Sequence, residues 1–188
     1  MSGSQTRVFR AFAHQTPDRT PLFEIFQPYH PIHWEICGRN PATDDAMAWD
    51  ARVQGIAARE LLEMEARAQY EIRAFFELDM VRLNSGTPAQ YVRPVKTGPA
   101  SWTLNGIPHV LDERTRLVVP ADAARHGYSS QVSEASVRRE IESWDGRGPA
   151  PATEPDPLFR RVRELADAAG LDWVYMGEIG RASCRERV

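Results

Sequence analysis

The sequence predicts an α/β fold built on a parallel sheet, and three observations support this prediction. A long amphipathic segment, residues 43–75, leads into a short apolar run at 80–84. A second helical pattern at 156–170 leads into another apolar run at 171–177. Helical and strand-like segments therefore alternate, which is typical of right-handed βαβ units and a parallel sheet.

The first predicted elements are a short helix and a short strand. Residues 6–15 carry apolar side chains at helical spacing, so we expect a helix there. The prolines of segment 17–21 exclude a helix and predict a turn. Residues 22–26 are apolar except for Glu24, as expected of a buried parallel strand. Segment 27–41 contains three prolines, and we expect a loop.

The longest predicted helix begins after Thr43, a good N-cap, and runs as one element to Phe75. Asp44 and Asp45 place negative charge in its first turn, where the helix dipole favours it. The apolar stripe expected to lie against the sheet recurs at spacings of three and four: Met47, Val53, Ile56, Ala57, Leu61, Met64, Ala68, Ile72 and Phe75.

Between the second and third strands the pattern changes to an antiparallel excursion. Residues 101–104 and 107–111 flank an Asn-Gly dipeptide, the strongest short hairpin signal. Residues 116–119 can add a further strand. We interpret this hairpin excursion as a lid or rim inserted into the parallel scheme.

The C-terminal third of the chain predicts two helices and the third strand. Ser133 is expected to cap the first helix, and a Gly- and Pro-rich loop follows it. Asp156 and Pro157 supply an N-cap and an N1 proline for the second helix, which Gly170 ends. Residues 171–177 then form the third strand.

Composition indicates a cytoplasmic protein. The 188 residues carry a net charge of −3, and arginines are dispersed among acids, which disfavours nucleic-acid binding. No apolar run approaches the ~20 residues of a membrane span. Residues 1–5 lack the charged and apolar regions of a secretory signal.

The last residues of the sequence indicate a C-terminal tail that is not native to the protein. Residues 179–188 are identified as the translation of a widely used sequencing adapter, which also supplies part of the codon for Glu178. We therefore interpret 178–188 as a non-native tail and expect the natural protein to continue past Gly177. A native Arg-rich tail is the alternative. Without the tail Cys37 is the one cysteine left, which agrees with a reducing compartment.

Several blocks carry a family resemblance. Residues 7–21 contain a Pro-Asp-Arg-x-Pro core, residues 38–41 read Gly-Arg-Asn-Pro, and residues 76–79 read Phe-Glu-Leu-Asp before the second strand. With the strand at 172–177, they resemble the uroporphyrinogen decarboxylase superfamily, which includes the haem-pathway decarboxylase and corrinoid-dependent methyltransferases. The resemblance covers most of 7–177 and implies a partial (β/α)₈ TIM barrel of about three strands.

The chain departs from the decarboxylase pattern where substrate would bind. Aligned on Pro21, the two arginines that hold substrate carboxylates fall on Phe26 and His30, and the catalytic aspartate falls on Gly86. Gln27 alone fits. The resemblance therefore implies a methyltransferase-like protein rather than a lyase of porphyrin biosynthesis. For the full-length parent, that branch implies zinc and a corrinoid protein as partner, with the zinc ligands in a C-terminal half.

Candidate substrate-pocket residues lie at or just after the ends of the first two strands: Glu24, Gln27, Arg82, Asn84 and Ser85. Glu24 lies within an apolar run, where a carboxylate is costly unless it is paired or functional. A structural ion pair with Arg19, Arg39 or Arg82 is the alternative to a functional role, and Glu24–Arg82 is the specific contact expected across neighbouring strands. Asn84 and Ser85 can bind a ligand or simply end the strand.

A metal site is not predicted in this chain. His30, His33 and Cys37 are usual zinc donors, but their spacing matches no closed site and a fourth ligand is not evident. We interpret them as residues lining the rim. The sequence also lacks a phosphate-binding Gly-rich loop, a serine-nucleophile elbow and zinc-finger spacing.

The sequence thus predicts the N-terminal part of a barrel enzyme that acts on a small molecule, with a non-catalytic barrel-derived binding or interaction protein as the alternative. We expect the chain itself to be inactive. We also expect it to aggregate or to expose apolar surface, because an open parallel sheet leaves edge N–H and C=O groups unpaired.

Overall fold

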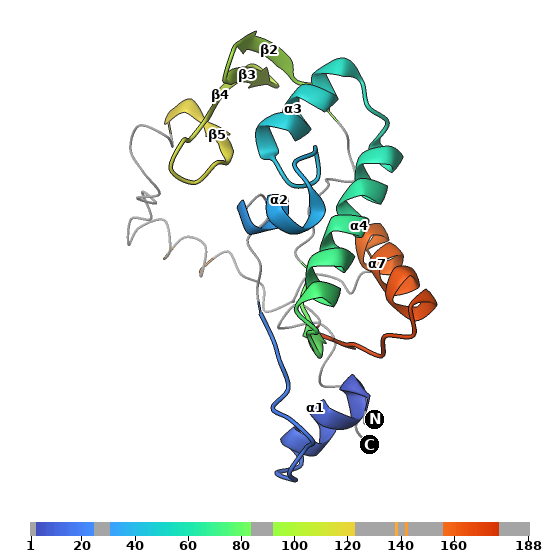
Figure 1. Ribbon diagram of the computed structural model, residues 1–188. Coiled ribbons are helices and arrows are strands. Elements are labelled where there is room, and N and C mark those ends of the chain that lie inside the picture. The colour runs from blue at the N-terminus through green and yellow to red at the C-terminus, as the bar shows by residue number, and fades with distance from the viewer. Residues whose placement is uncertain are drawn as a thin grey trace.

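The computed structural model describes residues 3–24, 31–83, 92–122, 138, 142 and 156–176. Figure 1 shows α1 at one end of the molecule and the strands β2 to β5 at the other. In chain order the elements are α1 (Ser4–Phe12), α2 (Pro31–Cys37), α3 (Asp45–Gln54), α4 (Ala58–Phe75), β1 (Met80–Val81), β2 (Val95–Gly98), β3 (Ser101–Leu104), β4 (Ile107–Leu111), β5 (Val118–Pro120), α7 (Pro157–Ala168) and β6 (Val174–Tyr175).

The parallel sheet is formed by β1 and β6, and the segment at Phe23 extends it. Met80 and Val81 pair in parallel with Val174 and Tyr175. Phe23 forms an isolated parallel bridge with Met80. The order across the sheet is therefore the Phe23 segment, β1 and β6, and a helix precedes each of the last two. This confirms the predicted parallel arrangement, although each strand is shorter than expected.

Helices α4 and α7 pack against each other and cover one face of the parallel sheet (Figure 1). The parallel core consists of the buried residues between them: Ala66, Val81, Leu158, Val162, Ala166 and Trp173. Successive strand residues face opposite sides of a sheet. Since Val81 and Trp173 face the helices, Met80, Arg82 and Val174 face away from them.

A separate antiparallel sheet has the strand order β2-β3-β4-β5. Its central hairpin is the predicted one, and Asn105 and Gly106 have φ angles of 52° and 78°, as a type I′ turn requires. The pairing of β5 with β4 confirms the further strand. Strand β2 was not predicted, because its side chains are mostly exposed and show no apolar alternation.

Helix α3 packs against this sheet and forms a second core with it. The antiparallel core consists of Trp49, Trp102 and Val118. Two carboxylates of α3 bind the sheet: Asp50 accepts from the Trp102 Nε1–H at 2.9 Å, and Asp45 accepts from the Val118 N–H at 2.7 Å. The excursion is thus fixed to one helix by both apolar and polar contacts.

The prediction of one helix over residues 43–75 is wrong, because the segment forms α3 and α4. Gly55 ends α3 with a φ of 89°, the left-handed conformation typical of a helix C-terminus. The N-cap of α3 is Asp44, not Thr43, and its side chain accepts from the Met47 N–H. Phe75, the last residue of the predicted stripe, is 65% exposed. The stripe therefore does not reach the core at that end.

The loop predicted over residues 27–41 contains a helix, α2. Pro31 occupies its first position, where proline is favoured because its missing N–H would have no helical partner. Proline content alone was therefore misleading. His33 of α2 is buried, and the Trp34 Nε1–H donates to the Thr43 carbonyl at 2.6 Å.

The remaining predictions are confirmed or lie outside the described residues. Helix α7 begins after Asp156, whose side chain accepts from the Leu158 N–H, and the chain turns at Gly170 with a φ of 72°. Of the predicted helix after Ser133, Arg138 and Glu142 are described and both are helical, while the rest of that helix and the tail at 178–188 lie outside the described residues. Within the described ranges, the sheets do not close into a barrel, and no helix has the length and apolar character needed to cross a membrane. The architecture is mixed α/β, with one parallel and one antiparallel sheet.

Candidate functional site

The two ends of the parallel sheet differ in what lies beyond them. Helix α1 contacts the residues at the amino ends of β1 and β6, whereas α2, α3 and the antiparallel sheet lie in the part of the molecule away from α1 (Figure 1). The amino-end contacts are direct: Ser4 and Gln5 donate their backbone N–H groups to Asp172, just before β6. In α/β proteins, ligands bind at the carboxyl ends of parallel strands, so that end is the candidate site.

Asp79, fully buried at the amino end of β1, organises a cluster of polar contacts that we call the Asp79 cluster. Its carboxylate accepts from the guanidinium groups of Arg7 and Arg19, with Arg19 at 2.7 Å. It also accepts from the Ser4 hydroxyl and the Leu22 N–H, each at 2.9 Å. These bonds join α1, the 17–21 turn, the first strand segment and β1.

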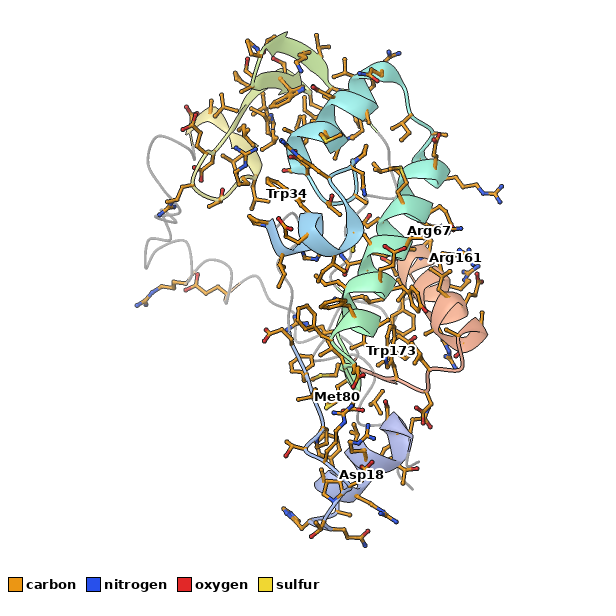
Figure 2. All side chains as sticks on the ribbon, viewed as in Figure 1. Asp18, Trp34, Arg67, Met80, Arg161 and Trp173 are labelled. Atoms are coloured by element: carbon orange, nitrogen blue, oxygen red, sulfur yellow. The ribbon has the colours of Figure 1, made fainter. Side chains whose placement is uncertain are left out.

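Asp18 extends the cluster toward solvent. It accepts from the Arg7 Nε and Nη2 at 2.8 and 2.9 Å, a bidentate pair. The hydrogen bond from Arg7 lowers the pKa of Asp18 to about 2. Figure 2 shows Asp18 at the α1 end of the molecule, well away from Trp34 near α2. The amino ends are therefore occupied by structural ion pairs.

At the carboxyl end, Arg82 directly follows β1. Its position in the strand alternation puts it on the face away from α4 and α7, level with Met176 on the neighbouring strand. Arg82 is half-buried, and its Nε is buried without a hydrogen-bond partner among the described residues. Its carbonyl accepts from the Nη2 of Arg73 at 2.9 Å. Desolvation lowers the pKa of Arg73 to about 10.

Glu24 lies at the end of the first strand segment and is exposed. The Phe23–Met80 bridge places Glu24 level with Val81, so the alternation puts it on the sheet face opposite to Arg82. The described ion pairs do not include Glu24–Arg82, and that expected contact is not confirmed. Arg19 instead pairs with Asp79.

The other predicted pocket residues cannot be placed. Gln27, Asn84 and Ser85 lie outside the described residues, as does His30. Of the predicted set, Glu24 and Arg82 are thus the two whose positions are described, and they occupy neighbouring strand segments at the same end of the sheet.

The potential metal donors in and around α2 have structural surroundings. The Cys37 thiol donates to the Ala68 carbonyl of α4 at 3.6 Å, and burial raises the pKa of that thiol to about 11. His33 is buried in the same helix. In the part of the chain that the structure describes, no three His, Cys, Asp or Glu side chains are grouped to hold a metal ion.

A cluster around Trp34 was not predicted. The guanidinium carbons of Arg39 and Arg116 lie 4.7 and 5.7 Å from the centre of its ring. Arg39 also pairs with the buried N-cap Asp44 at 2.7 Å. These contacts connect α2 to the turn before β5. Trp34 lies in a Pro-rich segment without helical or strand periodicity, so its contacts could not be predicted from the sequence.

The Asp79 cluster had a partial signal in the sequence. An aspartate directly before a buried strand is costly unless it has partners, and three arginines lie in the block at 7–21. The pairing itself joins residues more than 55 positions apart, and no local rule specifies it. Comparison of the chain with protein-family models, curated proteins and solved structures found no match.

Proposed function

We propose that this chain is the N-terminal part of a cytoplasmic barrel enzyme of the uroporphyrinogen decarboxylase superfamily, closer to its methyltransferase branch than to the haem-pathway decarboxylase. The observation that carries the proposal is the asymmetry of the parallel sheet. Ion pairs and α1 occupy the amino ends, while Arg82 ends β1 on the face away from the helices. A small-molecule site belongs at that carboxyl end.

The contacts within the resembling blocks support the proposal. Arg7, Asp18 and Arg19 belong to the block at 7–21, and Asp79 ends the block at 76–79. These residues form one hydrogen-bonded cluster around the buried Asp79. The residues that carry the resemblance are therefore also the ones that join the first strand segment to the second.

Exposed apolar side chains around the parallel sheet also favour a larger parent. Phe9 and Phe12 of α1 are 61% and 65% exposed, and Leu22 and Phe23 are 43% and 38% exposed. Large apolar side chains gathered on a surface usually mark a contact with further protein. We propose that further βα units cover part of this surface in the parent.

The described residues do not fit a zinc or corrinoid site. None of them forms a group of three or more metal-binding side chains. We therefore assign no catalytic step to a metal or a corrinoid within these residues. These residues supply the guanidinium of Arg82 at the carboxyl end of β1, where it can bind and orient a negatively charged group.

The decisive experiment is to amplify the source DNA across codon 178 and sequence it without the adapter chemistry. We expect the reading frame to continue past Gly177 into further βα units, with His and Cys residues at strand ends if the parent transfers methyl groups. Carboxylates at those positions without His and Cys would indicate a lyase. Strand ends with neither would indicate a binding protein, and a frame ending at Val188 would overturn the barrel proposal.

A further inference from the structure

We propose that Arg82 binds the carboxylate or phosphate group of a small anionic ligand at the carboxyl end of β1. The inference deepens the proposed function, because it names the ligand class for the end of the sheet where that function places the site. It makes Arg82 a ligand-binding residue rather than a structural one.

The described neighbours of Arg82 on its face of the parallel sheet are apolar. On the same sheet face, Met80 precedes it in β1, and Val174 and Met176 lie on the neighbouring strand, all half-buried. A guanidinium held in such a place loses hydration, and this loss is costly unless an anion or hydrogen-bond acceptors replace the water. The buried Nε of Arg82 has no such acceptor among the described residues.

Arg82 differs in this respect from four other arginines of the described chain, which pair with carboxylates. Arg7 and Arg19 bind Asp79, Arg39 binds Asp44, and Arg161 binds Glu63. No carboxylate of a described residue forms an ion pair with Arg82. Arg73, which is 1% exposed, is not part of these ion pairs either, but its guanidinium donates to the carbonyls of Gln69 and Arg82, each at 2.9 Å.

The segments that directly follow the first two strand segments in the sequence also lack acidic residues. Residues 25–30 and 84–91, which follow the first two strand segments in the chain, contain no Asp or Glu. Their polar residues are neutral hydrogen-bonding types or histidine. Glu24, the nearest carboxylate in sequence, is assigned by the strand register to the opposite face.

A second cation contacts the backbone of Arg82. The Arg73 guanidinium reaches the Arg82 carbonyl from the last turn of α4. Arg73 is almost fully buried, so its charge is weakly screened by water. The planar guanidinium of Arg82 favours carboxylate and phosphate because it can bind them with two parallel hydrogen bonds.

The test measures binding of phosphate and of succinate to the 188-residue chain through broadening of each ligand's own NMR signals, at constant ionic strength. We expect saturable binding of at least one anion. Arg82→Met should weaken it by at least about tenfold, since a charge-assisted hydrogen-bonded contact is lost. Arg82→Lys should retain part of the binding through its charge. The two ligands distinguish a phosphate site from a carboxylate site.

The matched control is Arg163→Met, which removes an arginine that is 62% exposed on α7. It should leave binding unchanged. Equal loss in both variants would indicate nonspecific attraction and overturn the proposal, as would unchanged binding in Arg82→Met with a native-like circular dichroism spectrum. If Arg82→Met does not fold, Arg82→Gln and Arg82→Lys give the same comparison. The DNA experiment tests the barrel parent independently, so the two failures are distinguishable.

Discussion

The parallel and antiparallel cores are stabilised in different ways. In the parallel region, apolar side chains form the core, while polar contacts are made by the Asp79 cluster at the strand amino ends and by the buried Arg73 of α4. The antiparallel core has two tryptophans and a valine, and carboxylates of α3 bind directly at its edge. The first arrangement places its ion pairs at the amino ends of the strands, opposite to the candidate site. The second fixes a small sheet to a single helix.

The largest effect is expected from Asp79→Asn. The substitution removes the negative charge between Arg7 and Arg19 and places an amide N–H among donors. Breaking a buried ion pair on one side costs about 3–5 kcal/mol. Hydrogen exchange of the backbone amides should show the free energy of opening lowered by this amount in α1, β1 and β6. The amides of β3 and β4 should keep their protection.

The control for this substitution is Asp167→Asn. Asp167 is exposed on α7, and its Arg163 contact is long, at 3.8 Å. Exposed pairs contribute about 0–1 kcal/mol, so exchange should barely change. If Asp79→Asn increased exchange equally in the hairpin, the two regions would unfold as one unit and the comparison would be wrong.

The next effect, of opposite sign, is expected from Asp45→Asn. Burial raises the pKa of Asp45 to about 6 from 3.8, so the folded protein binds the proton more tightly than the unfolded chain. Stability of the antiparallel region should therefore fall as pH rises from about 4 to about 6, by up to about 3 kcal/mol, and then level off. The negative charge of Asp44 also raises the pKa of Asp45, and the positive charge of Arg52 lowers it.

Asp45→Asn keeps an acceptor for the Val118 N–H but removes the charge. At pH 7 the variant should therefore be more stable than the wild type, and its stability should not change between pH 4 and 6 at this site. The measurement is hydrogen exchange of β5 across that range, corrected for intrinsic rates. Increasing protection of β5 with rising pH in the wild type would contradict the assignment.

A smaller effect is expected from Trp102→Phe. The change removes the hydrogen bond to Asp50 and part of a buried ring, at a cost of about 2 kcal/mol. Exchange should increase in β2 to β5 and not in β1 or β6. Asp50→Asn should cost less, because it keeps an acceptor for Trp102 and weakens only the partly exposed Lys96 pair. A larger loss for Asp50→Asn would show that the charge, not the indole contact, holds the sheet.

Local rules predicted some elements of both regions well. The hairpin was predictable because Asn105 and Gly106 specify the turn themselves, and α7 because Asp156, Pro157 and Gly170 mark both its ends. The break between α3 and α4 was missed, because apolar periodicity continues through Gly55 and outweighed one glycine.

The candidate site was predictable only in part. The polar residues at the strand ends indicated where to look, and Arg82 is described at such an end. The expected Glu24–Arg82 contact depended on register, which a strand only a few residues long does not specify in sequence. The Asp79 cluster depended on contacts between distant segments, which single-residue patterns do not contain.

The smallest loss of stability is expected from alanine substitutions at Gly55 and Gly170. They test whether the parallel and antiparallel regions are coupled through the chain that joins them. Gly55 and Gly170 both follow helices in the left-handed conformation, with φ angles of 89° and 72°. A Cβ would meet no atom closer than 3.8 Å at Gly55 and none within 4 Å at Gly170. Substitution by alanine therefore costs mainly backbone strain, about 1 kcal/mol in each case.

Gly55→Ala should lower protection in α3 and the antiparallel sheet, and Gly170→Ala should do so in α7 and β6. Asparagine, which tolerates this conformation, should cost less than alanine at both sites. Loss of protection in both regions from Gly55→Ala alone would show that the α3–α4 junction transmits strain. Arg52 and Arg93 would then be the residues responsible. Beside that junction, Arg52 donates to the Val92 carbonyl and Arg93 donates to the Val53 carbonyl.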